Sequence, residues 1–427
     1  MVLTGRAGLV ALAAVVLVAL TPAPAATLLV LDLLLLAAVV VDVLLAASPK
    51  RLSFERRLPV NGRLDETLDS VLLVRNDGPR RLRGRLRDAW PPSSGFSPSV
   101  QPLDLPVGER RRLEATLTPT RRGDRRAAAV AVRSLGPLGL AGRQRSIAVP
   151  GRVRILPHFR SRALLPEKLS RLRQVEGQVA ARGPGRGTEF DSLREYVPGD
   201  DVRSIDWRAT ARRTGLAVRV HRPERDRRVV LALDSGRTSA GRVADEPRLD
   251  HALDAALLLS ALALKAGDRI DLVAHDVAPR AVVERATLGS LSDAMALLEP
   301  GLVETSHDAL IGQVLRVARR RSLLVLFTDL VPAVVEEGLL PALAPVLRRH
   351  TVLLAALRDP RVEELAASRG DVSDVYAAAA AERALAERRR LAGLLRRRGV
   401  EVVDAPPAHF ASAVSDAYLA LKAAGRL

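Results

Sequence analysis

The chain has 427 residues and no cysteine, which excludes disulfides, thiolate catalysis and cysteine-ligated zinc. Its 48% hydrophobic and 27% charged residues predict folded domains with sizeable cores rather than a disordered chain. The formal net charge of +18 favours an anionic partner, such as a membrane leaflet, nucleic acid or an acidic protein, unless arginine simply fills solvated faces.

The first fifty residues contain two apolar segments. Ala7 to Leu20 offers 14 uncharged residues, about 21 Å of helix, which is shorter than a hydrocarbon core of ~30 Å. Ala26 to Ala47 has 22 residues and is long enough to span a membrane. We expect residues 1–48 to form a transmembrane helical hairpin that turns at two prolines. The alternative is a signal peptide that is cleaved at the "APA" sequence between the segments.

Charged residues in and after the second segment bear on its placement. Asp32 and Asp42 lie inside the segment, where an acidic residue is costly. Either they make polar contacts with a partner or they lean toward the headgroups. We expect the apolar segment to anchor the chain in the inner membrane. Basic residues that follow a membrane span usually stay in the cytoplasm, so the soluble domains are predicted to lie there. The basic residues behind this prediction are Lys50, Arg51, Arg56 and Arg57.

Three regions follow the apolar segments. Residues 49–155 carry short alternating runs, such as "SVLLVRN" and "AAAVAVRS", separated by turns rich in proline and glycine, and this pattern predicts an immunoglobulin-like β-sandwich. Residues 156–227 are predicted to be a charged connector. In residues 228–427, continuous apolar strands such as "RRVVLALD" alternate with helical stretches. That alternation predicts an α/β domain with a doubly wound, mainly parallel sheet.

Acidic residues follow two of these apolar strands. Asp234 begins "DSGRTS", and Asp329 lies in "FTDL". Parallel sheets bind ligands at the carboxyl ends of their strands, and carboxylates with nearby hydroxyls suit Mg²⁺. Mg²⁺ is therefore the candidate cofactor at this edge. The alternative is a polar loop in which Asp234 accepts backbone hydrogen bonds and caps the next helix.

The α/β part resembles a von Willebrand factor A domain, whose metal-ion-dependent adhesion site begins with an Asp-x-Ser-x-Ser loop. Asp234 matches the first position, and Thr238 stands at the second serine. Gly236 stands at the first serine and has no side-chain oxygen, so the site is degenerate. The ligands that the resemblance implies are Asp234, Thr238 and Asp329, with Thr305 or Ser306 as the loop residue.

The connector carries the segment "GRGTEFDSLREYVPGDDVRSIDWRATARRTG". It resembles the signature of a bacterial family called domain of unknown function 58, and "RRRSLLVLFTDL" further along resembles the same family. The resemblance implies a membrane-anchored accessory protein that works with a MoxR-type AAA+ ATPase and a client protein in assembly or maturation. The signature residues in place are Gly187, Glu189, Phe190, Leu193, Arg194, Tyr196, Gly199, Asp200, Arg203, Asp206, Trp207 and Arg208.

Two hypotheses describe what the connector does. Asp200 follows a Pro-Gly turn, and its carboxylate can pair with Arg203 or Arg208. The connector is then a charged latch on the α/β domain, with Trp207 and Tyr196 over its apolar underside. The second hypothesis makes it a basic docking surface for the ATPase.

Other function classes have weaker signals. Nucleic acid is not expected, because single-strand binding needs a row of aromatic platforms, and the arginine runs 388–390 and 396–398 indicate a solvated or membrane-facing helix. The chain has no phosphate-binding loop, no His-Glu-x-x-His helix and no nucleophile elbow. We therefore expect a non-enzymatic protein-interaction module. The alternatives are a metal-dependent hydrolase that uses the strand-end carboxylates, and a purely structural membrane scaffold.

Overall fold

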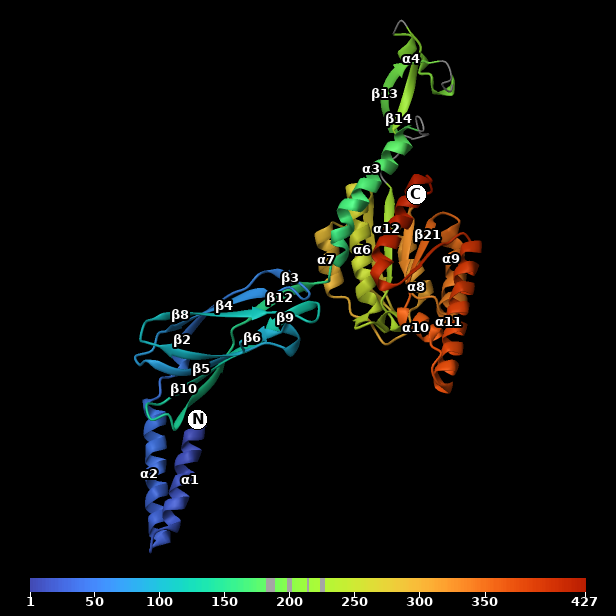
Figure 1. The fold of residues 1–427 in the computed structure, drawn as a ribbon. Helices are drawn as coiled ribbons and strands as arrows, with labels where there is room; N and C mark the ends of the chain where they lie inside the picture. The colour runs from blue at the N-terminus through green and yellow to red at the C-terminus, as the bar shows by residue number, and fades with distance from the viewer. Residues whose placement is uncertain (182–188, 198–201, 213–214, 223–226) are drawn as a thin grey trace. The chain divides into compact units, whose positions relative to one another are not determined.

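The computed structural model describes residues 1–181, 189–197, 202–212, 215–222 and 227–427 (Figure 1). The chain divides into two compact units, Met1–Leu156 and Pro157–Leu427. It is a mixed α/β protein with apolar N-terminal helices and sandwich-like sheets. The connector residues Gly187, Gly199 and Asp200 lie outside the described part, as do the side chains of Glu189, Phe190, Arg194 and Arg203.

Two apolar helices begin the first unit. Helix α1 spans Gly5–Ala19, helix α2 spans Pro24–Leu45, and the two pack side by side (Figure 1). In the described residues, one helical segment is long and apolar enough to cross a membrane, and it runs from Pro24 to Arg51 through the short turn η1 (Pro49–Arg51). A segment of this kind near the N-terminus is either a membrane anchor or a signal sequence.

Three sheets complete the first unit, in the strand orders β1-β11-β10-β5-β7, β2-β4-β8-β6 and β3-β12-β9. Burial alternates along β4 because successive side chains of a strand point to opposite faces, and Leu72 and Val74 thereby join the core. The strands are β1 Val2–Leu3, β2 Leu52–Arg57, β3 Asn61–Arg63, β4 Leu68–Asn76, β5 Leu82–Ala89, β6 Phe96–Ser97, β7 Val100–Leu105, β8 Arg110–Leu117, β9 Gly123–Ala127, β10 Ala129–Leu135, β11 Ala141–Ile147 and β12 Gly151–Leu156.

Asp42 joins helix α2 to the turn between β10 and β11. Its carboxylate is fully buried and accepts backbone hydrogen bonds from Leu138 (2.8 Å), Leu140 (2.7 Å) and Ala141 (2.8 Å). Of the two expectations for acidic residues in this segment, Asp42 follows the polar contact, whereas Asp32 is exposed on α2. The last turn of α2 is therefore held by the protein rather than by lipid.

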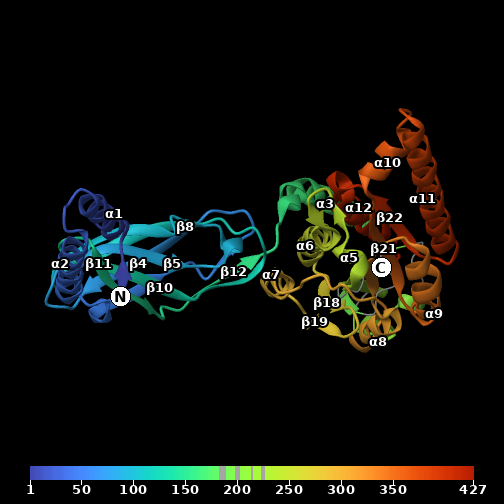
Figure 2. The same cartoon turned by 90° about the horizontal axis from the view of Figure 1, so that it is seen from below.

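A six-stranded sheet forms the centre of the second unit, in the order β19-β18-β15-β20-β21-β22. Neighbouring strands pair in parallel except at the edge strand β19, which is antiparallel. Along β15, Val229 and Leu231 face the core under α6 and α12, whereas Val230 and Ala232 face the core under α8 and α9 (Figure 2). Strands buried on both faces give the continuous apolar runs seen in the sequence.

The strands of this sheet are β15 Arg228–Asp234, β18 Arg269–His275, β19 Pro279–Val283, β20 Leu323–Phe327, β21 Thr351–Leu357 and β22 Glu401–Ala405. Two very short strands, β16 Arg242–Val243 and β17 Glu246–Pro247, pair separately. The helices around the sheet are α5 Arg237–Ala240, α6 Arg248–Lys265, α7 Leu288–Ala296, α8 His307–Val317, η5 Ala333–Leu339, α9 Leu340–Leu347, α10 Pro360–Ala367, α11 Val372–Arg397 and α12 Pro407–Ala423.

The segment predicted to be a connector contains regular structure. A short turn, η3 (Arg160–Leu164), leads into α3 (Leu165–Ala181), and Leu172 of α3 packs into the core shared with α6 and α12. Strands β13 and β14 then pair antiparallel. The remaining elements of this segment are β13 Glu189–Glu195, η4 Val202–Ser204, α4 Trp207–Thr210 and β14 Ala217–Arg222.

Candidate strand-edge carboxylate site

The two acidic residues singled out in the sequence lie at the same edge of the central sheet. Asp234 is the last residue of β15, and Asp329 follows β20 by two residues. The two strands are parallel neighbours, so their carboxyl ends meet at one edge. Both side chains are buried, with Asp234 only 2% exposed and Asp329 9% exposed.

Asp234 accepts four hydrogen bonds from the protein itself. Its Oδ1 accepts from the backbone N–H of Gly236 (2.9 Å) and the hydroxyl of Thr305 (2.5 Å). Its Oδ2 accepts from the hydroxyls of Thr238 (2.9 Å) and Thr328 (2.7 Å). Two donors at each oxygen use the hydrogen-bonding capacity of the carboxylate. The structure thus brings Thr238, which was predicted as a metal ligand, to Asp234 as a hydrogen-bond donor, and adds Thr328, which was not predicted.

Gly236 makes room for the Thr305 hydroxyl. A β-carbon at residue 236 would lie 2.2 Å from the Thr305 oxygen and 2.7 Å from the carbonyl oxygen of Val303. The hydroxyl of Thr305, from another loop, therefore occupies the space that a serine side chain at residue 236 would need. Of the two loop candidates, Thr305 reaches Asp234, whereas Ser306 caps α8 and accepts a hydrogen bond from the backbone of Ala309.

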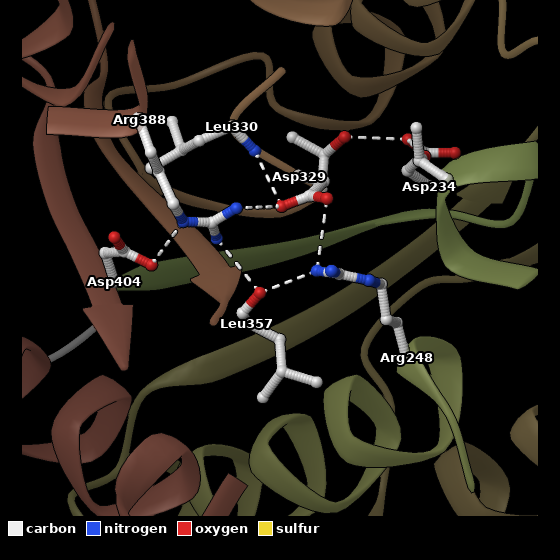
Figure 3. Close-up of polar contacts among 9 residues, drawn as sticks. Asp234, Arg248, Asp329, Leu330, Leu357, Arg388 and Asp404 are labelled. Carbon is white, nitrogen blue, oxygen red and sulfur yellow. Dashed lines mark hydrogen bonds and ion pairs between the residues drawn. The ribbon is translucent and has the colours of Figure 1, made fainter. Parts of the chain in front are cut away.

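Asp329 is held by two arginines from different helices (Figure 3). Arg388 of α11 donates from Nη1 to its Oδ1 (2.6 Å), and Arg248 of α6 lies 3.1 Å from its Oδ2. Both guanidinium groups also donate to the carbonyl oxygen of Leu357 at the end of β21. Arg388 further donates from Nε to Asp404 of β22 (2.9 Å). The carboxylate therefore belongs to a network that joins the ends of three strands.

The environment of Arg388 corrects one sequence prediction. Its side chain is only 12% exposed, so the solvated face predicted for run 388–390 is wrong at this residue. Burial lowers the pKa of Arg388, but the carboxylates of Asp329 and Asp404 outweigh that effect and leave the pKa raised. A helical signal was present in the sequence, because Arg388 stands three and seven residues before the buried Leu391 and Leu395.

The side chains at this edge do not fit a divalent cation as they are arranged. Mg²⁺ binds through oxygen atoms with free lone pairs, and it favours carboxylates. The oxygens of Asp234 already accept four donors, and Asp329 faces two cationic guanidinium groups. Within the described ranges, no group of three or more acidic or histidine side chains is placed to hold a metal ion.

Two buried polar atoms beside Asp234 have no hydrogen-bond partner in the described part of the chain. They are Nε2 of His307, which lies 3.9 Å from Asp234 Oδ2, and the hydroxyl of Ser235. Burial lowers the pKa of His307, and the nearby Asp234 raises it by less. The adjoining cavity is lined by Thr238, Arg248 and other residues of this edge and has room for about 30 Å³. It is the size of about one water molecule.

The ion pairs of the predicted latch lie largely outside the described residues, because Asp200 and the side chain of Arg203 are not among them. Asp206 caps the short helix α4 by accepting from the backbone N–H groups of Arg208 (3.0 Å) and Ala209 (3.0 Å). Trp207 is 65% exposed, so its indole is not the buried cover that the latch requires. Tyr196 donates its backbone N–H to the carbonyl of Leu216 (2.8 Å) and extends the pairing of β13 with β14.

The protein is therefore a mixed α/β protein with an apolar N-terminal helix. At the carboxyl ends of its central strands, where such folds often bind ligands, Arg248 and Arg388 pair with Asp329. Residues 192–392 match the family described as "Protein of unknown function DUF58". The family predicted from the connector segment is therefore confirmed over this part of the chain.

Two relatives with similar sequences come from mycobacteria. An uncharacterized protein of Mycobacterium bovis and one of Mycobacterium tuberculosis are each 32% identical to the chain over 204 residues. The match covers 45% of this chain and 60% of each relative. The chain therefore spans less than two thirds of these relatives, and neither carries an assigned activity.

Two solved structures show a weak likeness to part of the chain. The CARDB domain of a Pyrococcus furiosus protein, solved in complex with di-metal ions, matches 26% of this chain and 90% of its own length, with 13% identity and a TM-score of 0.18. A β-glucosidase of Listeria innocua matches 26% of this chain and 16% of its own length, at the same identity and TM-score. At these scores the likeness supports no conclusion about fold or function.

Proposed function

We propose that the protein is a membrane-anchored, non-enzymatic protein-interaction module of the inner membrane, with its soluble units in the cytoplasm. Its partner is a MoxR-type AAA+ ATPase, and the two act together on a client protein during assembly or maturation. The family resemblance supplies the class of partner. The anchor is supported by the apolar segment Pro24–Arg51 and by the basic residues that end it.

The observation that carries the proposal is the exposed indole of Trp207. It lies in the part of the chain that matches the family and is 65% exposed, in a protein with only two tryptophans. Val197 (56%) and Val202 (61%) are exposed in the same connector. Tryptophan and arginine are enriched at the energetic centres of protein interfaces, and the next residue, Arg208, is also exposed. Exposed apolar side chains together with exposed arginine support docking of a partner that has apolar and acidic groups.

The topology supports a von Willebrand factor A-like domain in the second unit. Five parallel strands and one antiparallel edge strand are covered by helices on both faces. Asp234, Thr305 and Asp329 gather at the carboxyl edge, where the adhesion site of that fold lies. The resemblance is one of architecture, because the surroundings of Asp329 differ from a metal site.

The geometry favours an interaction role over hydrolysis. A carboxylate that acts as a general base needs an oxygen free to take a proton from the substrate or water. Each oxygen of Asp234 already accepts two hydrogen bonds from the protein. A structural scaffold without a partner stays an alternative, and the experiment below distinguishes it.

Site-specific crosslinking in living cells tests the proposal. A photoreactive phenylalanine analogue replaces Trp207 in the full-length chain, and crosslinked proteins are identified by mass spectrometry. The matched control places the same analogue at Leu302, which is 84% exposed in the same unit. We expect an AAA+ ATPase to be captured from residue 207 and not from residue 302. Capture of no protein at residue 207, or equal capture at both positions, contradicts the docking role and leaves the scaffold.

A further inference from the structure

We propose that Arg248 and Arg388 replace a divalent cation at the carboxyl edge of the sheet, so that this edge is held together without metal. The inference goes beyond the proposed interaction role, because it concerns the chemistry of the strand edge and not the connector. It also differs from the Mg²⁺ site that the sequence predicts. Three observations carry it, and they concern Arg388, Arg248 and Asp234 in turn.

The guanidinium group of Arg388 makes one bond with each of its three nitrogens. Nη1 donates to Asp329 (2.6 Å), Nε to Asp404 (2.9 Å) and Nη2 to the carbonyl oxygen of Leu357 (2.9 Å). Asp329 follows β20, Leu357 ends β21, and Asp404 is the last but one residue of β22, so one cation bridges three adjacent strands. A planar guanidinium suits this task because its donors are fixed in direction and its charge is permanent.

Arg248 repeats part of this pattern from the opposite side. Its Nη1 lies 3.1 Å from Oδ2 of Asp329 and donates to the carbonyl oxygen of Leu357 (2.6 Å). Figure 3 shows the two guanidinium groups converging on Asp329 and Leu357 from α6 and α11. A metal ion at the carboxyl edge of a sheet joins the ends of neighbouring strands by binding oxygen atoms from each of them. In this protein two arginines join the strand ends instead.

The carboxylate of Asp234 is already satisfied by the protein, so an ion at this edge would have to bind Asp329. Asp234 accepts four hydrogen bonds, and the space of the absent Ser side chain at Gly236 is filled by the hydroxyl of Thr305. A divalent cation bound to Asp329 has to displace at least one guanidinium or tolerate it at close range. Repulsion between like charges is strong in such a buried setting, because the effective dielectric constant is low. The arginines therefore exclude the ion by charge.

Direct measurement of Mn²⁺ binding tests the proposal. Mn²⁺ stands in for Mg²⁺ and reports binding by its paramagnetic resonance signal, with the full-length chain purified in detergent. We expect the wild-type chain to leave Mn²⁺ free up to about 1 mM, the weak limit of protein cation sites. The double variant Arg248→Gln and Arg388→Gln removes both charges and keeps polar side chains. It should bind Mn²⁺ at least about tenfold more tightly than the wild-type chain does, since 1.4 kcal/mol of lost repulsion gives a factor of ten.

Two further variants make the result interpretable. Arg388→Lys keeps the positive charge and should stay without Mn²⁺, even if the bonds to the strand ends are weakened. Arg390→Gln is the matched control, because Arg390 lies on the same helix and pairs with Glu387 and Glu336 instead. Mn²⁺ binding by the wild-type chain that Asp329→Asn abolishes overturns the proposal. A folded double variant that gains no affinity also overturns it.

Discussion

The contact of Asp42 with the turn between β10 and β11 gives the sharpest stability prediction. Asp42→Ala removes the acceptor of three backbone N–H groups. Leu138 is 51% exposed, so its N–H can bind water after the change, whereas Ala141 is fully buried. If the other two bonds to the charged group contribute about 1.5–3 kcal/mol each, the substitution costs about 3–6 kcal/mol locally. Asp42→Asn keeps one acceptor oxygen and should cost less.

Hydrogen exchange measured by mass spectrometry reports this cost at the turn itself. A loss of about 3 kcal/mol raises the exchange rate of the protected amides roughly 150-fold, since 1.4 kcal/mol corresponds to a factor of ten. Peptides that cover residues 136–142 of the full-length chain in detergent provide the readout. Asp32→Ala is the control, because Asp32 is exposed on the same helix. Unchanged exchange at the turn in the Asp42→Ala chain refutes the anchoring role of this carboxylate.

Two further predictions concern buried ionisable groups of the second unit. The ammonium group of Lys422 lies 3.0 Å from the buried carboxylate of Asp268, and Lys422→Met leaves that carboxylate without this partner. The unfolding free energy should fall by about 3–5 kcal/mol, and hydrogen exchange in α12 measures the loss. Burial lowers the pKa of His307 and of His350, so the unfolded chain binds more protons below about pH 6.5. Stability should be complete above that pH and decline as the pH falls through the lowered folded values. Denaturant unfolding at several pH values should show a shallower decline for His350→Gln, and an unchanged slope contradicts this origin.

The sequence was sufficient for features that depend on local pattern. The apolar runs of the central strands predicted a buried parallel sheet because both faces of such strands are covered. The position of Asp234 and Asp329 at one edge followed from their places at the ends of adjacent strands. These inferences need only the period of the side chains and the direction of the strands.

Features that depend on contacts between distant segments escaped the sequence analysis. Arg388 reaches Asp329 across 59 residues of chain, and only the packing of α11 determines that pairing. Asp42 meets its three donors 96 to 99 residues away. A missing ligand at Gly236 predicted a weakened metal site, but it did not reveal that Thr305 fills the space. In each case the deciding partner is remote in sequence and chosen by tertiary packing.

The most direct test of the central claim is affinity purification of the full-length chain from solubilised membranes, with the bound proteins identified by mass spectrometry. The comparison is between the wild-type chain, Trp207→Ala and the exposed-residue control Leu302→Ala. We expect an AAA+ ATPase to accompany the wild-type and Leu302→Ala chains and to be lost from the Trp207→Ala chain. Absence of the ATPase from the wild-type sample, or its full retention by the Trp207→Ala chain, contradicts the proposed docking role of Trp207.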